Sequence, residues 1–135
     1  MDGAAQQLRN FAASHPEIQA VFVFGSIVSR ATHKGSDVDV AILLQHEMDD
    51  SESSRLSLTY CVELEDRLRT PVDVVILNNA GPLLRFQVFR KGKMICSTDV
   101  NQTRRFIGNA LVEFYDEIVL IERMQDRAIR GLIGR

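Results

Sequence analysis

The segments IQAVFVFGS (residues 18–26) and DVDVAILL (residues 37–44) decide the fold. The first is rich in β-branched and aromatic residues and ends at a Gly-Ser pair, which is typical of a short buried strand that meets a turn. The second alternates before it becomes wholly apolar, which predicts a second strand with Asp37 and Asp39 on one face. A third strand is predicted at 72–77, where Asp73 lies inside an apolar run bounded by turn-forming residues.

Helical periodicity accounts for most of the remaining chain. An N-terminal helix should stop near Ser14, because a proline follows two residues later. Further helices are predicted at 53–69 and 83–89, and a short edge strand at 93–96. A long helix should run from Val100 to beyond Ile129, with Asp99 as its N-cap. Strands separated by helices indicate an α/β or α+β sandwich, a small mixed sheet flanked by helices.

Length and composition narrow the class of protein. The 135 residues fit one domain, which we divide into a core at 1–98 and a C-terminal helix at 99–135. The formal charge is −2, so we expect neither membrane attachment nor direct nucleic-acid binding. No apolar run has the length of a bilayer span, and we expect no leader, because residues 1–7 lack a basic stretch followed by an apolar core. Two cysteines, Cys61 and Cys96, suit buried thiols of a cytoplasmic protein better than a disulfide.

Three carboxylates lie where strands should be. Burying an uncompensated carboxylate is costly, so Asp37, Asp39 and Asp73 each require a metal ion, a basic partner or solvent. Hard divalent cations such as Mg²⁺ prefer carboxylate and phosphate oxygens. Gly25 and Ser26 directly follow a strand, where glycine permits close backbone approach and a following helix would offer free amides to phosphate. The order of these features favours a metal-dependent nucleotide site.

A simpler interpretation remains for each feature taken alone. Asp37 and Asp39 could form the solvent face of a half-exposed strand, with Asp73 paired to an arginine. A Gly-Ser pair alone is a still weaker signal.

The spacing of these residues resembles a known family. Gly25 and Ser26, ten intervening residues, and then Asp37-Val38-Asp39 resemble the signature of the DNA polymerase β superfamily of nucleotidyltransferases, with Asp73 as the third carboxylate. The small size is similar to that of the minimal nucleotidyltransferases (MNT), commonly antitoxins encoded beside a helical HEPN-type ribonuclease toxin. The resemblance covers most of 18–98 and implies a polymerase β-like fold. The long terminal helix matches only in kind.

The resemblance also implies a mechanism. Asp37 and Asp39 would hold two divalent metals, Mg²⁺ or alternatively Mn²⁺, and Asp73 would complete the catalytic metal site and help to activate the acceptor hydroxyl. Gly25 and Ser26 would grip the terminal phosphates of ATP. The acceptor would be a tyrosine hydroxyl of the toxin, so that transfer of AMP disables the ribonuclease.

The chain departs from the family pattern in the loop after Ser26. Many relatives carry arginine and then glycine where this chain has Ser29 and Arg30. Arg30 either replaces the phosphate-contacting arginine after a small shift or is a solvated surface residue. Ser36 is a further candidate for phosphate contact, whereas Lys34 and His33 fit a surface loop better.

Two alternatives stay open beside the leading hypothesis of an adenylylating antitoxin. The first is an antitoxin that neutralises its toxin by contact alone. The second is a nucleotidyltransferase that acts on a small molecule such as an aminoglycoside, although larger relatives use an added domain for that acceptor. The apolar stripe of the long helix favours an arm that docks a partner, because one small sheet cannot easily cover so long a helix.

Overall fold

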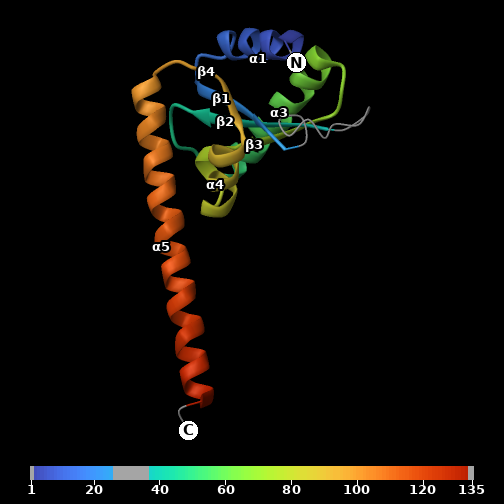
Figure 1. Cartoon of the computed structure of the whole chain (residues 1–135). Helices are drawn as coiled ribbons and strands as arrows, with labels where there is room; N and C mark the ends of the chain where they lie inside the picture. The colour runs from blue at the N-terminus through green and yellow to red at the C-terminus, as the bar shows by residue number, and fades with distance from the viewer. Residues whose placement is uncertain (1, 26–36, 134–135) are drawn as a thin grey trace.

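A mixed β-sheet forms the centre of the protein (Figure 1). The computed structural model describes residues 2–25 and 37–133. The strands follow the order β3-β2-β1-β4, in which β1 is antiparallel to both neighbours and β2 is parallel to β3. The strand bounds are Ile18–Phe24 (β1), Val38–Leu44 (β2), Val72–Ile76 (β3) and Lys93–Ser97 (β4). The predicted strands and mixed sheet are confirmed.

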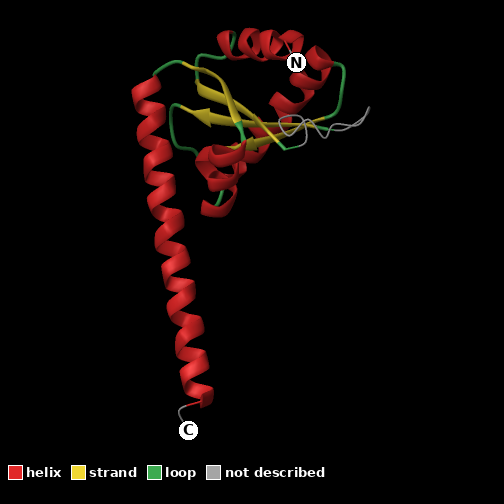
Figure 2. Cartoon of the chain, viewed as in Figure 1, coloured by secondary structure: helices red, strands yellow, loops and turns green. Residues whose placement is uncertain are grey.

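Helices cover both faces of this sheet (Figure 2). On one face, the α1–α3 face, lie α1 (Asp2–Ala13) and α3 (Asp50–Leu68). On the other, the α4–α5 face, lie α4 (Pro82–Lys91) and the first part of α5 (Val100–Ile133). A short 3-10 turn, η1, spans Leu77–Asn79 between β3 and α4. The predicted sandwich of helices on a sheet is therefore confirmed.

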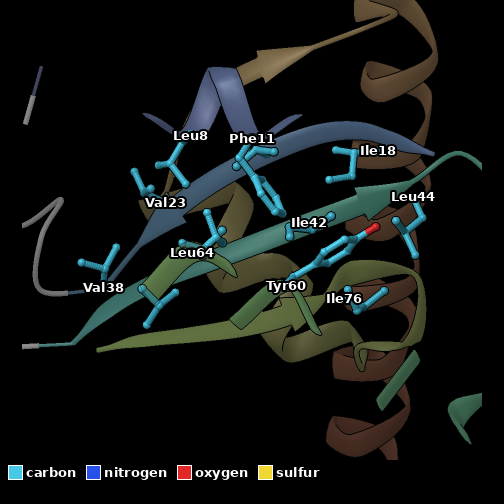
Figure 3. Close-up of a cluster of buried hydrophobic side chains, with 13 residues drawn as sticks. Leu8, Phe11, Ile18, Val23, Val38, Ile42, Leu44, Tyr60, Leu64 and Ile76 are labelled. Atoms are coloured by element: carbon cyan, nitrogen blue, oxygen red, sulfur yellow. The ribbon is translucent and has the colours of Figure 1, made fainter. Parts of the chain in front are cut away.

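The larger hydrophobic core lies on the α1–α3 face (Figure 3). Tyr60 of α3 and Phe11 of α1 are fully buried, and their rings meet edge to face with centroids 5.2 Å apart. Each aliphatic side chain buried in this layer contributes about 1.5–3 kcal/mol relative to an exposed one. Alternate residues of β1 and β2 supply the sheet side of the core: Val21, Val23, Val38, Val40, Ile42 and Leu44.

Capping side chains explain where two helices begin. The Asp49 carboxylate accepts a hydrogen bond of 2.8 Å from the Glu52 amide, so α3 starts at Asp50, three residues before the predicted start. The predicted cap of the long helix is confirmed, because the Asp99 carboxylate accepts a hydrogen bond of 3.1 Å from the Gln102 amide. Helix α3 ends at Leu68, followed by a residue with left-handed backbone.

Helix α5 divides into a packed part and a projecting part (Figure 1). Thr103 and Ala110 are buried against the body, and Phe114 stacks on Phe86 of α4 with centroids 3.9 Å apart. Every residue from 119 to 132 is exposed. We call residues 119–132 the α5 arm. None of the helices within residues 2–25 and 37–133 combines the length and the apolar character that a bilayer span requires.

The two ends of the sheet differ in chemistry. The acidic end is where β1 finishes and β2, β3 and β4 begin, and the far end is where β1 begins. At the far end the buried Asn78 side chain accepts a hydrogen bond of 2.8 Å from the Leu44 amide and donates one of 3.0 Å to the Leu44 carbonyl. The buried Gln19 side chain donates to the Thr103 hydroxyl at 3.0 Å. These side chains join β2 to η1 and β1 to α5.

A second polar cluster at the far end connects α1, β1 and α3. The Tyr60 hydroxyl donates a hydrogen bond of 2.6 Å to Glu17, and the two ring nitrogens of His15 lie 3.2 Å from Glu17 and 2.9 Å from Glu63. Partial burial acts to raise the pKa of Glu17. The hydrogen bond from Tyr60 and the proximity of His15 outweigh burial, so the pKa lies below its ordinary value. The far end is thus electrostatically satisfied.

Candidate active site

Strand pairing brings two of the candidate carboxylates together at the acidic end. Asp73 is the pairing partner of Asp39 in the parallel ladder between β2 and β3. Asp37 stands two residues before Asp39, just outside the strand. Neighbouring strands lie about 5 Å apart, so the three carboxylates crowd one edge of the sheet.

Alternation along the strands shows which face these side chains share. Val38 and Val40 point into the core of the α1–α3 face, so Asp39 between them points to the α4–α5 face. Val72 and Val74 flank Asp73 in the same way. The carboxylates of Asp39 and Asp73 therefore project from the same face of the sheet.

Gly25 lies against the carboxylate of Asp39. Its φ angle is +77°, which glycine adopts more readily than any other residue. A β-carbon at this position would overlap the Asp39 side chain. The turn after β1 thus favours glycine for its backbone conformation, and the missing β-carbon leaves room for the Asp39 carboxylate.

The pKa of Asp39 lies above its ordinary value. Partial burial raises its pKa, and the negative charges of Asp73 and Asp37 raise it further. No lysine, arginine or histidine among residues 2–25 and 37–133 forms an ion pair with these carboxylates. The interpretation that an arginine pairs with Asp73 therefore finds no support in the part of the chain that the structure describes.

The donor set fits a divalent cation by its chemistry. Three carboxylates that repel one another offer hard oxygen ligands, and a bound cation would offset their mutual repulsion. Within the described ranges, no three acidic, histidine or cysteine side chains already stand at metal-binding distance. The carboxylates would therefore have to draw together around an ion.

Part of the expected site lies outside the described residues. Ser26, Arg30 and Ser36, the other candidates for phosphate contact, belong to 26–36, as do His33 and Lys34. The structure thus places four of the seven candidates: Gly25, Asp37, Asp39 and Asp73.

The connection between α4 and β4 was not assigned a role by sequence reasoning, yet it reaches the acidic end. A β-carbon at Gly92 would lie 2.9 Å from the Val23 carbonyl oxygen and 3.3 Å from the β-carbon of Phe24. Phe24 is in turn the antiparallel partner of Asp39. The signal in the sequence was the glycine between Lys91 and Lys93.

Known proteins share both sequence and fold with this chain. It is 31% identical over 83 residues to the protein adenylyltransferase MntA of Shewanella oneidensis, an alignment that covers 62% of this chain and 57% of the relative. The matched region thus spans little more than half of that relative.

Two solved structures resemble nearly the whole chain. One is a toxin–antitoxin with AMP-PNP, at 24% identity and a TM-score of 0.61, covering 96% of this chain and 94% of that chain. The other is a tri-AMPylated Shewanella oneidensis HEPN toxin in complex with MNT antitoxin, at 21% identity and a TM-score of 0.62, covering 98% and 97%. At these identities the likeness shows a common fold.

The sequence also matches a family model. The match is to the family described as polymerase beta, nucleotidyltransferase, and it runs over residues 6–101, which include all four strands and the candidate carboxylates. The resemblance found in the sequence is confirmed: the chain belongs to the polymerase beta nucleotidyltransferase family.

Proposed function

We propose that this chain transfers AMP from ATP to a protein hydroxyl, and that the acceptor is a tyrosine of a cognate HEPN-type toxin. The chain would thereby act as an antitoxin. The observation that carries the proposal is the crowding of Asp37, Asp39 and Asp73 beside Gly25 on a nucleotidyltransferase sheet. The adenylyltransferase relative and the structures of a toxin–antitoxin with AMP-PNP and of a tri-AMPylated toxin support this choice of reaction and partner.

Asp37 and Asp39 are the residues that would hold two divalent cations, Mg²⁺ or alternatively Mn²⁺. Bound there, the cations would neutralise the triphosphate and the departing pyrophosphate. The Gly25 backbone, with Ser26, Arg30 and Ser36, would hold the phosphates.

Asp73 has a separate role in this proposal. Its side chain is exposed at the edge of the sheet and shares a face with Asp39. It would complete the metal site and take the proton of the acceptor hydroxyl as that oxygen attacks the α-phosphorus. A new oxygen–phosphorus bond forms, the bond to the bridging oxygen breaks, and pyrophosphate leaves with the electron pair.

We further propose that residues 1–98 form the catalytic core and that 99–135 form a helix whose arm docks the toxin. Apolar side chains recur at alternating spacings of four and three up to Ile121, as in a coiled-coil seam, and the same positions continue through the arm with one polar residue, Gln125. Large apolar side chains of the arm, among them Ile121 and Leu132, are exposed and are suited to bury against a partner. The seam comprises Ile107, Leu111, Phe114, Ile118, Ile121, Gln125, Ala128 and Leu132, of which the last four are exposed.

The arm is tested with paired substitutions. Ile121→Asp should prevent formation of a complex with purified toxin on size exclusion, because a charge would enter the seam. Leu120→Asp, on another side of the helix, is the matched control and should leave the complex intact. Equal effects of the two substitutions would refute a seam-specific interface.

We assign the protein to the cytoplasm. Cys61 and Cys96 are free thiols in the structure, which suits a reducing compartment. Burial raises the pKa of each thiol, which favours its protonated, less reactive form.

The exposed seam of the α5 arm also favours the alternative function, in which this chain neutralises its toxin by contact alone. An Asp37→Ala/Asp39→Ala protein that still neutralises the toxin would support this rival. The small-molecule alternative has no such observation in its favour.

The direct test uses ATP labelled on the α-phosphate, Mg²⁺ and lysate of the source cells. A labelled protein band should form with the unmutated chain, and its mass identifies the acceptor. The Asp37→Ala/Asp39→Ala variant should give no band. Equal labelling by both proteins would refute the proposed site.

A further inference from the structure

We propose that Glu65 of α3 is a positioning residue for the carboxylate site, because it holds the backbone of β3 directly before Asp73. The inference rests on the proposed function, in which Asp73 activates the acceptor hydroxyl. Sequence reasoning gave Glu65 no role. Three observations carry the inference: the contacts of α3 with Val72, the place of β3 at the edge of the sheet, and a hydrogen bond between this segment and β2.

Two side chains of α3 bind the backbone of Val72. The Glu65 Oε2 atom accepts a hydrogen bond of 3.0 Å from the Val72 amide, and the Cys61 thiol donates one of 3.0 Å to the Val72 carbonyl oxygen. Cys61 and Glu65 are four residues apart, so they lie on the same side of the helix. Both side chains are half-buried, whereas Val72 itself is buried. Water therefore competes with these contacts only in part.

The contacts of Val72 lie at the edge of the sheet. Strand β3 stands at one end of the strand order β3-β2-β1-β4. An edge strand leaves alternate amide and carbonyl groups without a strand partner. At Val72 those groups are bound by Glu65 and Cys61. The beginning of β3 is thus held between β2 and the side chains of α3, and the next residue along the strand is Asp73.

The same segment of backbone also holds β2. The amide of Val38, the residue directly before Asp39, donates a hydrogen bond of 3.0 Å to the Pro71 carbonyl oxygen. Pro71 and Asp73 flank the residue whose amide Glu65 binds. Two hydrogen bonds and a short stretch of chain therefore connect Glu65 to both strands that carry the carboxylates. A shift of this segment would move Asp73 relative to Asp39.

The Glu65 hydrogen bond would also contribute to stability alone, and a second glutamate of α3 serves as the control for that effect. Glu63 is half-buried like Glu65. Its carboxylate lies 2.9 Å from the His15 ring and 3.1 Å from the Arg67 guanidinium, in the polar cluster of the far end. Glu63→Ala therefore removes contacts of α3 without touching β3.

The first measurement needs no nucleotide. Amide hydrogen exchange at Val72 is followed by NMR, and Glu65→Ala should speed it at least ~10-fold, because the amide loses its acceptor. Glu65→Gln keeps a side-chain oxygen as acceptor and should change the rate by less than about three-fold. Glu63→Ala should leave exchange at Val72 unchanged. Thermal unfolding checks that all three variants fold.

The second measurement follows AMP transfer to purified toxin. Glu65→Ala should lower kcat about ten-fold and change the KM for ATP less than about two-fold, because Asp73 acts on the acceptor hydroxyl. Glu65→Gln should restore kcat to within about three-fold of the unmutated chain. In an Asp73→Asn background, Glu65→Ala should cost less than about two-fold, because the group that Glu65 positions is already lost.

Other outcomes would overturn the inference. Unchanged exchange at Val72 in Glu65→Ala would exclude the contact. Equal losses of transfer in Glu65→Ala and Glu65→Gln would assign the effect to the charge of Glu65. Equal losses with Asp73 and with Asn at that position would leave Glu65 a structural role alone. If the unmutated chain transfers no AMP, the proposed function fails, whereas exchange at Val72 still reports on the contact between α3 and β3.

Discussion

The two ends of the sheet differ in the partners of their polar side chains. At the far end, Asn78 and Tyr60 are buried and hydrogen-bonded to backbone or to a carboxylate. At the acidic end, Asp37, Asp39 and Asp73 repel one another. Partnered polar groups stabilise a fold, whereas carboxylates held together without partners cost stability and are suited to bind cations. The polar side chains of the far end thus contribute to stability, and the acidic end is available for chemistry.

The largest effect that this contrast predicts is at the acidic end. Asp37→Asn/Asp39→Asn should lower the rate of AMP transfer at least ~100-fold, because the metal ligands are lost. The same variant should unfold at the same temperature as the unmutated chain or higher, because repulsion is relieved. Transfer of α-phosphate label and thermal unfolding measure the two quantities. A large loss of stability would contradict the division between the ends.

The next effect is at the far end. Asn78→Ala should lower the free energy of unfolding by about 2–4 kcal/mol, because it leaves the buried amide and carbonyl of Leu44 unpaired. Urea titration measures the loss. Asn79→Ala is the control, since its exposed side chain donates only to Met48 and Asp50, and it should cost less than about 1 kcal/mol. Equal losses for the two substitutions would show that the buried hydrogen bonds of Asn78 stabilise the fold no more than those of an exposed side chain.

Tyr60→Phe should have a smaller effect. It removes the hydroxyl that donates to Glu17 but keeps the ring in the core, so we expect a loss of about 1 kcal/mol in urea titration. Tyr115→Phe, at an exposed position, should cost nothing measurable. A loss of several kcal/mol would show that the ring itself had moved.

The smallest effects are in pH dependence, and their signs should differ between the ends. The pKa of Glu17 is lowered, so its stabilising contribution is complete above the ordinary glutamate pKa and disappears as the pH falls through the folded value. The pKa of Asp39 is raised, so its charge destabilises the fold at neutral pH and that penalty disappears on acidification.

Thermal unfolding between neutral and acidic pH checks both signs. The advantage of the unmutated chain over Glu17→Gln should shrink as the pH falls. The disadvantage of the unmutated chain relative to Asp39→Asn should shrink over the same range. If the stability difference from the unmutated chain had the same sign for Glu17→Gln and Asp39→Asn, the predicted contrast between the two ends would be wrong.

Local patterns were enough to predict most of the fold. The alternation at 37–40, the apolar run at 18–24 and the capping residue Asp99 identified strands and a helix that the structure confirms. The predicted start of α3 was three residues too late, because Asp49 and several residues after it could all serve as caps. Only the backbone shows which of them caps the helix.

Contacts between distant segments could not be predicted in this way. The pairing of Asp39 with Asp73 depends on the register of a parallel ladder, which no local pattern sets. The contact of Asn78 with Leu44 and the approach of Gly92 to Phe24 likewise join segments far apart in sequence.

The most direct test of the central claim compares ATP labelled on the α-phosphate with ATP labelled on the γ-phosphate, using the purified chain, Mg²⁺ and the purified cognate toxin. Nucleotidyl transfer moves the α-phosphorus and releases the other two. We expect label on the toxin from the α-labelled ATP alone, and none when Asp37→Asn/Asp39→Asn replaces the unmutated chain. Label from the γ-phosphate, or none from either ATP, would contradict nucleotidyl transfer by this chain.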